Sequence, residues 1–328
     1  MMNFEFSEEQ QMLRDQARSY LTQHCPTTLV RRVLNNRETH DADLYKGIAE
    51  MGWTATTIPE EYGGLGMSYL ELVVIAEELG RACAPVPFSS TVYLAAEAIM
   101  ALGTEAQKQA WLPKFAEGTA IGCFAMGEAG GRVTPDQMST RMQDGVLNGT
   151  KVPVADGGIA SVAIVVCASD KGDGASLALV DLSQDAVSKD NVQMIDFSRG
   201  HTELVFDGAC AEMLGEEGAG WTAVESLMNT AAVLFAWEQI GIADKALEQA
   251  REYALGRFAF GRSIASYQAI KHKLAKMYVK NTLARSNAYY GAWALNAKAS
   301  DLAVASATSR VAAIQASLFA AEENIQTH

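Results

Sequence analysis

A segment near the C-terminal end combines residue types that bind phosphate groups. Arg257 is followed by the pair Phe260–Gly261 and then by Gln268, and an apolar repeat of helical spacing continues to Met277. A guanidinium offers phosphate oxygens a planar fork of donors and keeps its charge. The Gln268 amide can both donate and accept hydrogen bonds. These residue types are suited to holding a phosphate-bearing ligand.

Both polar residues of this segment also have a plainer interpretation. Arg257 at a helix end typically caps the last carbonyl groups or stays in solvent. Gln268 is typical of an exposed position on a helix. The unbroken register of the whole stretch favours the binding role and predicts that both side chains contact a ligand.

The elements that must position this segment begin with a helical part, which extends to about residue 118. Ser7 and Gln10 have the spacing of a capping box, which predicts a helix start. Apolar stripes of helical spacing follow in residues 13–21 and 69–79. Between them, residues 58–66 contain the Gly and Pro residues that predict a loop.

A second capping box lies near the end of this helical part. Thr104 and Gln107 have the required spacing, so a short helix is predicted to begin there. Pro113 cannot donate a backbone hydrogen bond, and we expect the short helix to end at this residue.

The spacing of apolar residues changes between about residues 119 and 215. β-rich runs replace the helical stripes, and residues 171–174 predict a turn between two of them. Strand and turn signals lie at residues 147–150, 162–167, 177–182 and 203–208. Because no helical stripes separate these strands, we predict a small antiparallel sheet or barrel instead of a parallel sheet with alternating helices.

Helical spacing returns from about residue 216 to residue 328. The residues Val311, Ile314, Leu318, Ala321 and Ile325 follow one another at intervals of three and four, the pattern of a bundle seam. The sequence therefore predicts a mainly α-helical protein with a central β domain. Its parts are an N-terminal helical domain (1–118), a middle β domain (119–215) and a C-terminal helical bundle (216–328). No Gly or Pro stop signal follows the last helical residues, so we expect this bundle to be incomplete at its C-terminal end.

Composition restricts the partners of the chain. Lys and Arg number 26 against 39 Asp and Glu, a formal net charge of -13. Such a surface repels nucleic acid and anionic lipid as a whole, although a local basic patch can hold an anion such as coenzyme A. The N-terminal residues lack the features of a signal or transit peptide, and no apolar run is predicted to span a membrane, which favours a cytoplasmic location.

The cysteines and histidines predict no metal centre. Five cysteines are scattered singly and no two form a C-x-x-C pair, which indicates reduced, buried thiols. The five histidines have no metal-ligand spacing.

Residues 257–277 resemble the signature R-x-x-F-G-x-x-I-x-x-x-Q-x-I-x-x-x-L-A-x-M of FAD-dependent acyl-CoA dehydrogenases. Residues 58–66 and 77–80 resemble the I-P-E-x-x-G-G-x-G and E-E-L segments of the same family. The order of helices, sheet and helices also fits, so the resemblance covers nearly the whole chain. It implies an oxidoreductase of lipid metabolism that removes hydrogen from the α and β carbons of an acyl-CoA thioester. The implied cofactor is FAD, and the implied partner is an electron-transfer acceptor protein.

The resemblance also implies where the cofactor binds. In that family the residues matching Arg257 and Gln268 hold the ADP half of a flavin that belongs to the neighbouring subunit. Phe260 would pack near the edge of the adenine. Gln326 resembles the Gln of the family's I-Q-x-x-G-G-x-G segment, which lies near the same ADP group. The glycines of that segment are absent because the sequence ends at His328.

Two segments of the middle domain depart from the family pattern. The family has T-E-P-x-A-G-S-D over the flavin, where residues 127–132 have Gly-Glu-Ala-Gly-Gly-Arg. It also has K-x-W-I-T-N, whose Trp lies against the flavin ring and whose Thr hydroxyl bonds flavin N5. Here Pro153 replaces the Trp and Ala155 replaces the Thr. Ala cannot donate a hydrogen bond and Pro has no flat ring, so both contacts with the flavin ring are predicted to be lost.

The catalytic residue is unknown from the sequence. The reaction needs a carboxylate that removes the α proton of the thioester. The usual family Glu would lie beyond His328, and the alternative family position on the preceding helix falls on Ala231, which cannot act as a base. Glu238 is one of the few acids of that helix, and we interpret it as a buried or interface-paired carboxylate.

These departures favour a partner subunit of a heteromer over a self-sufficient enzyme. The chain resembles the subunits, known in bacterial steroid side-chain degradation, that complete the cofactor site of a catalytic sister chain. Three alternatives stay open: a homo-oligomeric dehydrogenase whose base lies beyond His328, a flavin-dependent monooxygenase on the same fold, and a catalytically inactive structural subunit. The sequence does not indicate which acyl-CoA is used.

Overall fold

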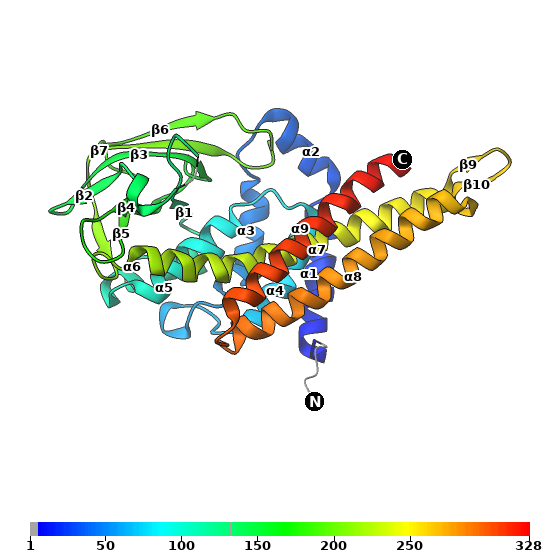
Figure 1. The fold of residues 1–328 in the computed structure, drawn as a ribbon, viewed down its shortest axis with the longest axis horizontal. Coiled ribbons are helices and arrows are strands. Elements are labelled where there is room, and N and C mark those ends of the chain that lie inside the picture. The colour runs from blue at the N-terminus through cyan, green and yellow to red at the C-terminus, as the bar shows by residue number, and fades with distance from the viewer. Residues whose placement is uncertain (1–5, 132) are drawn as a thin grey trace. The chain divides into compact units, whose positions relative to one another are not determined.

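The computed structural model describes residues 6–131 and 133–328, and along the chain its strands follow one group of helices and precede another (Figure 1). The helices before the sheet are α1 (Glu8–His24), α2 (Thr27–Asn36), α3 (Ala42–Glu50), α4 (Tyr69–Ala82), α5 (Glu97–Leu102) and α6 (Glu105–Ala116). A π-helix, Ser89–Ala96, leads directly into α5. The helices after the sheet are α7 (Gly220–Gly256), α8 (Gln268–Asn296) and α9 (Leu302–Thr327). The predicted fold class, helical at both ends with a β-rich middle, is confirmed.

The described residues group into two compact units. One unit contains residues 6–27, 68–84 and 229–328, and is built from α1, α4, most of α7, α8 and α9. The other contains residues 28–67 and 85–228, which include the sheet. The division into domains 1–118, 119–215 and 216–328 stays a prediction.

Within the described residues the sheet has eight strands: β1 (Gly122–Ala125), β2 (Arg141–Gln143), β3 (Val146–Ala155), β4 (Val162–Ala168), β5 (Ala175–Asp181), β6 (Val187–Val192), β7 (His201–Cys210) and β8 (Glu212–Leu214). The strand order is β6-β7-β3-β2-β4-β5-β8, and β1 pairs with β4. Most pairs are antiparallel, as predicted, but β1 and β2 both run parallel to β4.

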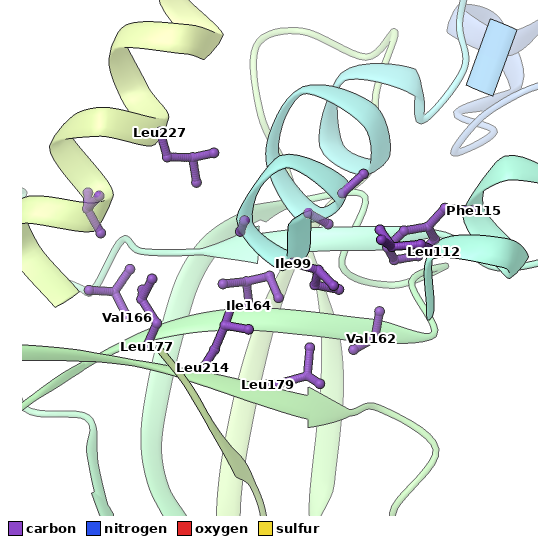
Figure 2. Packing of buried hydrophobic residues seen from close by; sticks show 14 of the residues in the cluster. Ile99, Leu112, Phe115, Val162, Ile164, Val166, Leu177, Leu179, Leu214 and Leu227 are labelled. Carbon is purple, nitrogen blue, oxygen red and sulfur yellow. The ribbon is translucent and has the colours of Figure 1, made fainter. Parts of the chain in front are cut away.

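The sequence of strand β4 is apolar without interruption, and the position of the strand in the sheet explains why. All its residues are buried, because both faces of the strand are covered. Ile164 and Val166 belong to a core that also contains Ile99 of α5, Phe115 of α6 and the start of α7 (Figure 2). The intervening Ala163 and Val165 point into a second core on the other side of the sheet. A strand buried on both faces needs apolar residues at every position.

Both predicted capping boxes are present. The Ser7 hydroxyl accepts a hydrogen bond from the Gln10 backbone, and the Gln10 side chain accepts one from the Ser7 backbone. Thr104 and Gln107 make the same reciprocal pair at the start of α6. The predicted helix end at Pro113 is wrong, because α6 continues to Ala116. Leu112 and Phe115 are fully buried in the core, and this burial outweighs the hydrogen bond lost at the proline.

The cysteines are only partly buried, which corrects another expectation. Cys25, Cys123 and Cys167 are buried, whereas Cys83 and Cys210 are exposed. Cys83 is the residue after the last turn of α4 and adopts the left-handed conformation with φ 49°.

Helices α4 and α7 cross at backbone contact through two glycines. A Cβ at Gly80 would lie 2.0 Å from the Glu238 carbonyl oxygen, and one at Gly241 would lie 1.9 Å from the Glu77 carbonyl oxygen. Both distances are impossible for real atoms, so any side chain here forces the helices apart. The Gly of the segment Glu77–Gly80 is therefore required by close helix approach.

We expect Gly241→Ala to destabilise the protein by about 1–3 kcal/mol, the usual range for overpacking a close contact. Urea unfolding followed by far-UV circular dichroism measures the change. Gly256→Ala is the matched control, because no atom lies near a Cβ at that position. Equal stability of both variants would contradict the helix crossing described here.

Candidate functional site

The predicted cofactor-binding residues lie around one end of the bundle formed by α7, α8 and α9 (Figure 1). Arg257 follows the last residue of α7, Gln268 is the first residue of α8, and Gln326 lies in the last turn of α9. Asn324 of α9 donates to the Gln249 side chain of α7 at 3.0 Å, which holds these helix ends together. The His328 ring stacks on Tyr253 of α7 with centroids 4.2 Å apart. The end of α7, the start of α8 and the end of α9 therefore lie at the same end of the bundle, and each carries one of these three residues.

A small hairpin between α7 and α8 holds Phe260 at its tip. Its strands are β9 (Phe258–Ala259) and β10 (Arg262–Ser263). Gly261 (φ 80°) and Phe260 (φ 53°) both adopt the left-handed conformation in the turn, which explains the glycine of the Phe-Gly pair. The Phe260 side chain is 98% exposed. An apolar ring held in solvent is the expected state of a residue whose contact comes from another molecule.

The hairpin is fixed to the helices by several contacts. The Ser263 hydroxyl donates to the Ala254 carbonyl at 2.7 Å, and the Tyr267 hydroxyl donates to the Ala259 carbonyl at 3.0 Å. The Arg262 guanidinium lies over the Tyr267 ring at 4.0 Å. These contacts hold the hairpin that carries Phe260, and the Ile264 N–H, which donates to the Arg257 carbonyl at 2.8 Å, joins the base of the hairpin to the residue after α7.

The polar side chains of this site have no partner within the described chain. Among residues 6–131 and 133–328, no side chain bonds to that of Arg257, Gln268 or Gln326, and all three are exposed. Helix α8 begins without a side-chain cap, since Tyr267 supplies none. The free N–H groups and the positive end of the helix dipole favour an anion at this position.

The predicted bundle seam of α9 faces solvent in the single chain. Val311, Leu318 and Ile325 are 55%, 59% and 78% exposed, and Ile314 is 41% exposed. The residues that pack α9 against α8 are small, and they include Ser309, Ala313 and Ala316. The interpretation of the large apolar residues as an internal seam is therefore wrong, because the small residues occupy the face that contacts α8.

Helix α9 is also long and apolar enough to pass as a membrane span. Of its most apolar stretch of 18 residues, 28% is buried inside the described chain. The sequence analysis predicted no segment able to span a membrane, so this finding differs from that prediction. The helix packs along α8 through its small residues, and an exposed row of large apolar residues is typical of a protein interface.

The two segments expected to face a flavin ring lie against each other in the sheet unit. The Val152 backbone N–H donates to the Gly127 carbonyl at 2.9 Å. The Lys151 ammonium donates to Glu128 Oε1 at 2.7 Å and to the Met126 carbonyl at 3.2 Å. Beside them is a cavity of about 280 Å³. Its lining comprises Glu128, Ala129, Gly130, Gly131, Val133, Gln137 and Met138.

Pro153 and Ala155 leave this region without the ring contacts of the family pattern. The Val152–Pro153 peptide bond is cis, and Ala155 is the last residue of β3. The next residue, Asp156, takes the place of an Asn and is buried. Its carboxylate accepts a hydrogen bond from the Ser90 hydroxyl of the π-helix, and the Arg199 guanidinium lies 3.8 Å away. Asp156 therefore anchors the end of β3 to the π-helix.

The candidate acids of α7 show no catalytic arrangement. Ala231 is buried, with 2% exposure, and offers no ionisable group. Glu238 is half-buried. Burial lowers the pKa of Arg310, and the negative charge of Glu238 opposes this change. The nearby positive charge of Arg310 agrees with the interpretation of Glu238 as a structural carboxylate of the bundle.

The helical unit contains a buried ion network that the sequence did not reveal. Arg285 of α8 donates to both Glu77 of α4 and Asp244 of α7 at 2.6 Å. Arg14 of α1 lies 3.1 Å from the same Glu77 carboxylate. Burial opposes ionisation of Glu77, but the guanidinium of Arg285 and the other arginines keep its pKa below the ordinary value. The network borders a cavity of about 600 Å³ and ties four helices together.

Comparison with known proteins decides the family. Residues 7–119 match the model of the acyl-CoA dehydrogenase N-terminal domain, and residues 218–328 match that of the acyl-CoA dehydrogenase C-terminal domain. The acyl-CoA dehydrogenase IpdE2 of Mycobacterium tuberculosis is 31% identical over 325 residues, which cover 98% of this chain and 85% of the relative. The chain belongs to the acyl-CoA dehydrogenase family.

Solved structures of the family share the fold. Butyryl-CoA dehydrogenase from Megasphaera elsdenii has a TM-score of 0.90 at 27% identity, with 99% of this chain and 89% of that chain covered. A variant of the Tcur3481–Tcur3483 steroid ACAD has a TM-score of 0.87 at 27% identity. The match covers 98% of this chain and 87% of that chain. Acyl-CoA dehydrogenases are oxidoreductases that act on acyl-CoA thioesters, so the predicted enzyme class is confirmed.

Two polar contacts of the sheet unit were not predicted from the sequence. One is the Glu128–Lys151 pair, although both residues match the Glu of T-E-P and the Lys of K-x-W-I-T-N. The other is Asp156, which matches the Asn of the second segment. Glu128 and Lys151 match the letters of the family segments, and Asp156 stands where the second segment has Asn. These matches were the sequence feature from which the contacts could have been predicted.

Proposed function

We propose that the chain is a cytoplasmic subunit of an FAD-dependent acyl-CoA dehydrogenase that completes the cofactor site of a second subunit. The observation that carries the proposal is the rigid, exposed group at the end of the bundle: Arg257, Phe260 and Gln268. These side chains are exposed and have no side-chain partner among residues 6–131 and 133–328. An exposed group of this kind is completed by a ligand held on another subunit.

The residues of this group fit the ADP part of FAD. Arg257 would donate its fork of N–H groups to the pyrophosphate oxygens, and the uncapped start of α8 would add backbone donors. Gln268 would form paired amide hydrogen bonds, and Phe260 would lie against the adenine edge. Gln326 would extend the same surface. Bound FAD supplies the hydride acceptor for the substrate β carbon.

The sheet unit fits the flavin ring less well, and this favours a heteromer with a sister subunit over a homo-oligomer. Ala155 has no hydroxyl to donate to flavin N5, and Pro153 gives no aromatic wall. The steroid ACAD Tcur3481–Tcur3483, which shares the fold at 27% identity, bears a name that joins two chains. In the proposed assembly the sister subunit supplies the ring contacts and the base. An electron-transfer acceptor protein takes up the electrons.

The exposed apolar row of α9 provides a surface for such an assembly. Val304, Val311, Leu318 and Ile325 of α9 are each more than half exposed, and Val279 and Leu283 of α8 are equally so. Subunit interfaces that are obligate bury surfaces of this apolar character.

We expect Arg257→Ala to weaken FAD binding by the assembled oligomer. The loss should be about 1.5–3 kcal/mol, the range for a hydrogen bond to a charged group, or roughly 10- to 150-fold in dissociation constant. Titration of the apo-oligomer with FAD, followed by flavin fluorescence, measures it. Arg31→Ala, which removes an exposed arginine of α2, is the control and should bind as the wild type does. Unchanged affinity in Arg257→Ala would count against the proposed function.

A further inference from the structure

The cavity beside the buried ion network of the helical unit is lined mainly by arginines. Residues of α1, α4, α7 and α8 form it, and its volume of about 600 Å³ lies in the range of small-molecule sites. Its guanidinium groups belong to Arg14, Arg18, Arg81, Arg251 and Arg285, against three carboxylates in the lining. The cavity is therefore positively charged, although the whole chain has a formal net charge of -13.

The ion pairs around this cavity do not use every guanidinium donor. Arg18 donates from Nε and Nη2 to the buried Glu78 carboxylate at 3.0 and 2.6 Å, which leaves its Nη1 group without an acceptor among the described residues. Arg81 pairs through Nη2 with Glu248, which also accepts from Lys245. When Glu78 and Lys245 are counted with the lining, six cationic side chains stand against four carboxylates. Two positive charges thus remain unbalanced.

Arg251 has no counter-charge within the described chain. Its side chain is exposed, and no hydrogen bond or ion pair joins it to residues 6–131 or 133–328. It lies one turn after Leu247 and Glu248 on the same face of α7, and all three residues line the cavity. A guanidinium presents phosphate oxygens with a planar fork of donors and keeps its charge. Arg251 and the unused Nη1 of Arg18 are therefore suited to an anionic group.

The cavity also has an apolar part. Leu247, Tyr278 and Tyr289 line it together with the arginines. Tyr289 is fixed by its contact with Trp237, whose ring centroid lies 5.0 Å away. Tyr278 is 63% exposed, so one face of an aromatic ring is open to a ligand. Apolar groups beside unbalanced guanidinium groups are suited to a ligand that has an anionic head and an apolar body.

We propose that this cavity binds a small phosphate monoester whose ester group is apolar. A phosphate monoester carries a charge of about −1.5 to −2 at neutral pH, which matches the two unbalanced positive charges. Arg251 and Arg18 donate to the phosphate oxygens, and the ester group lies against Leu247 and Tyr278. The cavity shares no lining residue with the group Arg257, Phe260 and Gln268, so its ligand is distinct from FAD and its test needs no cofactor.

The test separates the anionic head from the apolar body. Phenyl phosphate, inorganic phosphate and phenol are titrated into the full chain by isothermal titration calorimetry at low ionic strength, because salt screens exposed charges. The variants are Arg251→Gln and Tyr278→Ala. Both side chains are exposed, so each variant should melt as the wild type does, which a thermal scan verifies. Arg31→Gln, at an exposed arginine of α2, is the matched control.

We expect the wild type to bind phenyl phosphate saturably and at least about 10-fold more tightly than inorganic phosphate, with no measurable binding of phenol. Arg251→Gln should weaken the binding of both phosphates at least about 10-fold, because a charged donor is lost. Tyr278→Ala should weaken the binding of phenyl phosphate and leave that of inorganic phosphate unchanged. Arg31→Gln should bind both ligands as the wild type does.

Three results would overturn the phosphate site. One is the absence of saturable binding of phenyl phosphate by the wild type. Another is equal affinity for phenyl phosphate in Arg251→Gln and the wild type, which would place any binding elsewhere on the chain. The third is equal affinity in Tyr278→Ala and the wild type, which would leave the apolar part of the cavity without a role. None of these results bears on FAD binding, so the proposed function stands or fails separately.

Discussion

The chain purified alone should turn over acyl-CoA substrates at least about 10²–10⁴-fold more slowly than the same chain assembled with a sister subunit that carries the base and the N5 donor. Ala231 supplies no carboxylate, and Ala155 supplies no hydroxyl. Loss of the N5 donor adds to the deficit, because that donor stabilises the reduced flavin as hydride arrives. The isolated chain should also be nearly colourless.

Reduction of a ferricenium-type acceptor by a panel of acyl-CoA thioesters measures this difference. The assay is run on the chain alone, on the sister alone and on the co-expressed pair, with flavin content determined by absorbance for each. The sister alone is the control for activity that needs no partner. Rapid turnover by this chain alone with one FAD per subunit would rule out the partner-subunit role and support a homo-oligomeric dehydrogenase.

Arg285→Met should destabilise the helical unit by about 3–5 kcal/mol, the usual cost of removing one partner from a buried ion pair. The substitution leaves Glu77 with 5% side-chain exposure and removes its bidentate partner. It also removes the 2.6 Å contact with Asp244. The lost methylene packing is small, because Met is similar in length to the arginine stem.

Urea unfolding followed by circular dichroism and tryptophan fluorescence measures the loss. Arg141→Met is the matched control, because its pair with Asp170 is exposed, at 58% and 91%. Exposed pairs contribute about 0–1 kcal/mol, so this control should unfold near the wild type. A loss of under about 1 kcal/mol in Arg285→Met would show that the network does not hold the four helices together.

The same network predicts how stability depends on pH. Although burial opposes it, the arginines keep the folded pKa of Glu77 below the ordinary value of 4.5. A carboxyl with a depressed folded pKa contributes stability above its unfolded pKa and loses it as the pH falls through the folded value. The free energy of unfolding should therefore fall more steeply below pH 4.5 in the wild type than in Glu77→Gln, which has no carboxyl to protonate. Parallel curves would contradict this.

Local pattern was enough to predict the elements and the family. Capping boxes at Ser7 and Thr104 depend on residues three positions apart, so the sequence contains both partners. Strand β4 is continuously apolar and could be recognised at once. The segment from Arg257 to Gln268 places its side chains through one hairpin and one helix start. Its recognition needed no distant contact.

Tertiary structure decided everything that depends on what covers a residue. Spacing showed that Val311, Leu318 and Ile325 share one face, but not that the small residues of α9 pack on α8 and leave this face in solvent. Pro113 continues a helix because the core surrounds its neighbours Leu112 and Phe115.

The ion pairs follow the same rule. Glu128 and Lys151 stand on different segments, as do Glu77 and Arg285. Each charge is stable in the interior only because its partner and further donors arrive there from another part of the chain. A sequence read locally gives the residue types and their periodicity, whereas burial and electrostatic pairing arise from the complete fold.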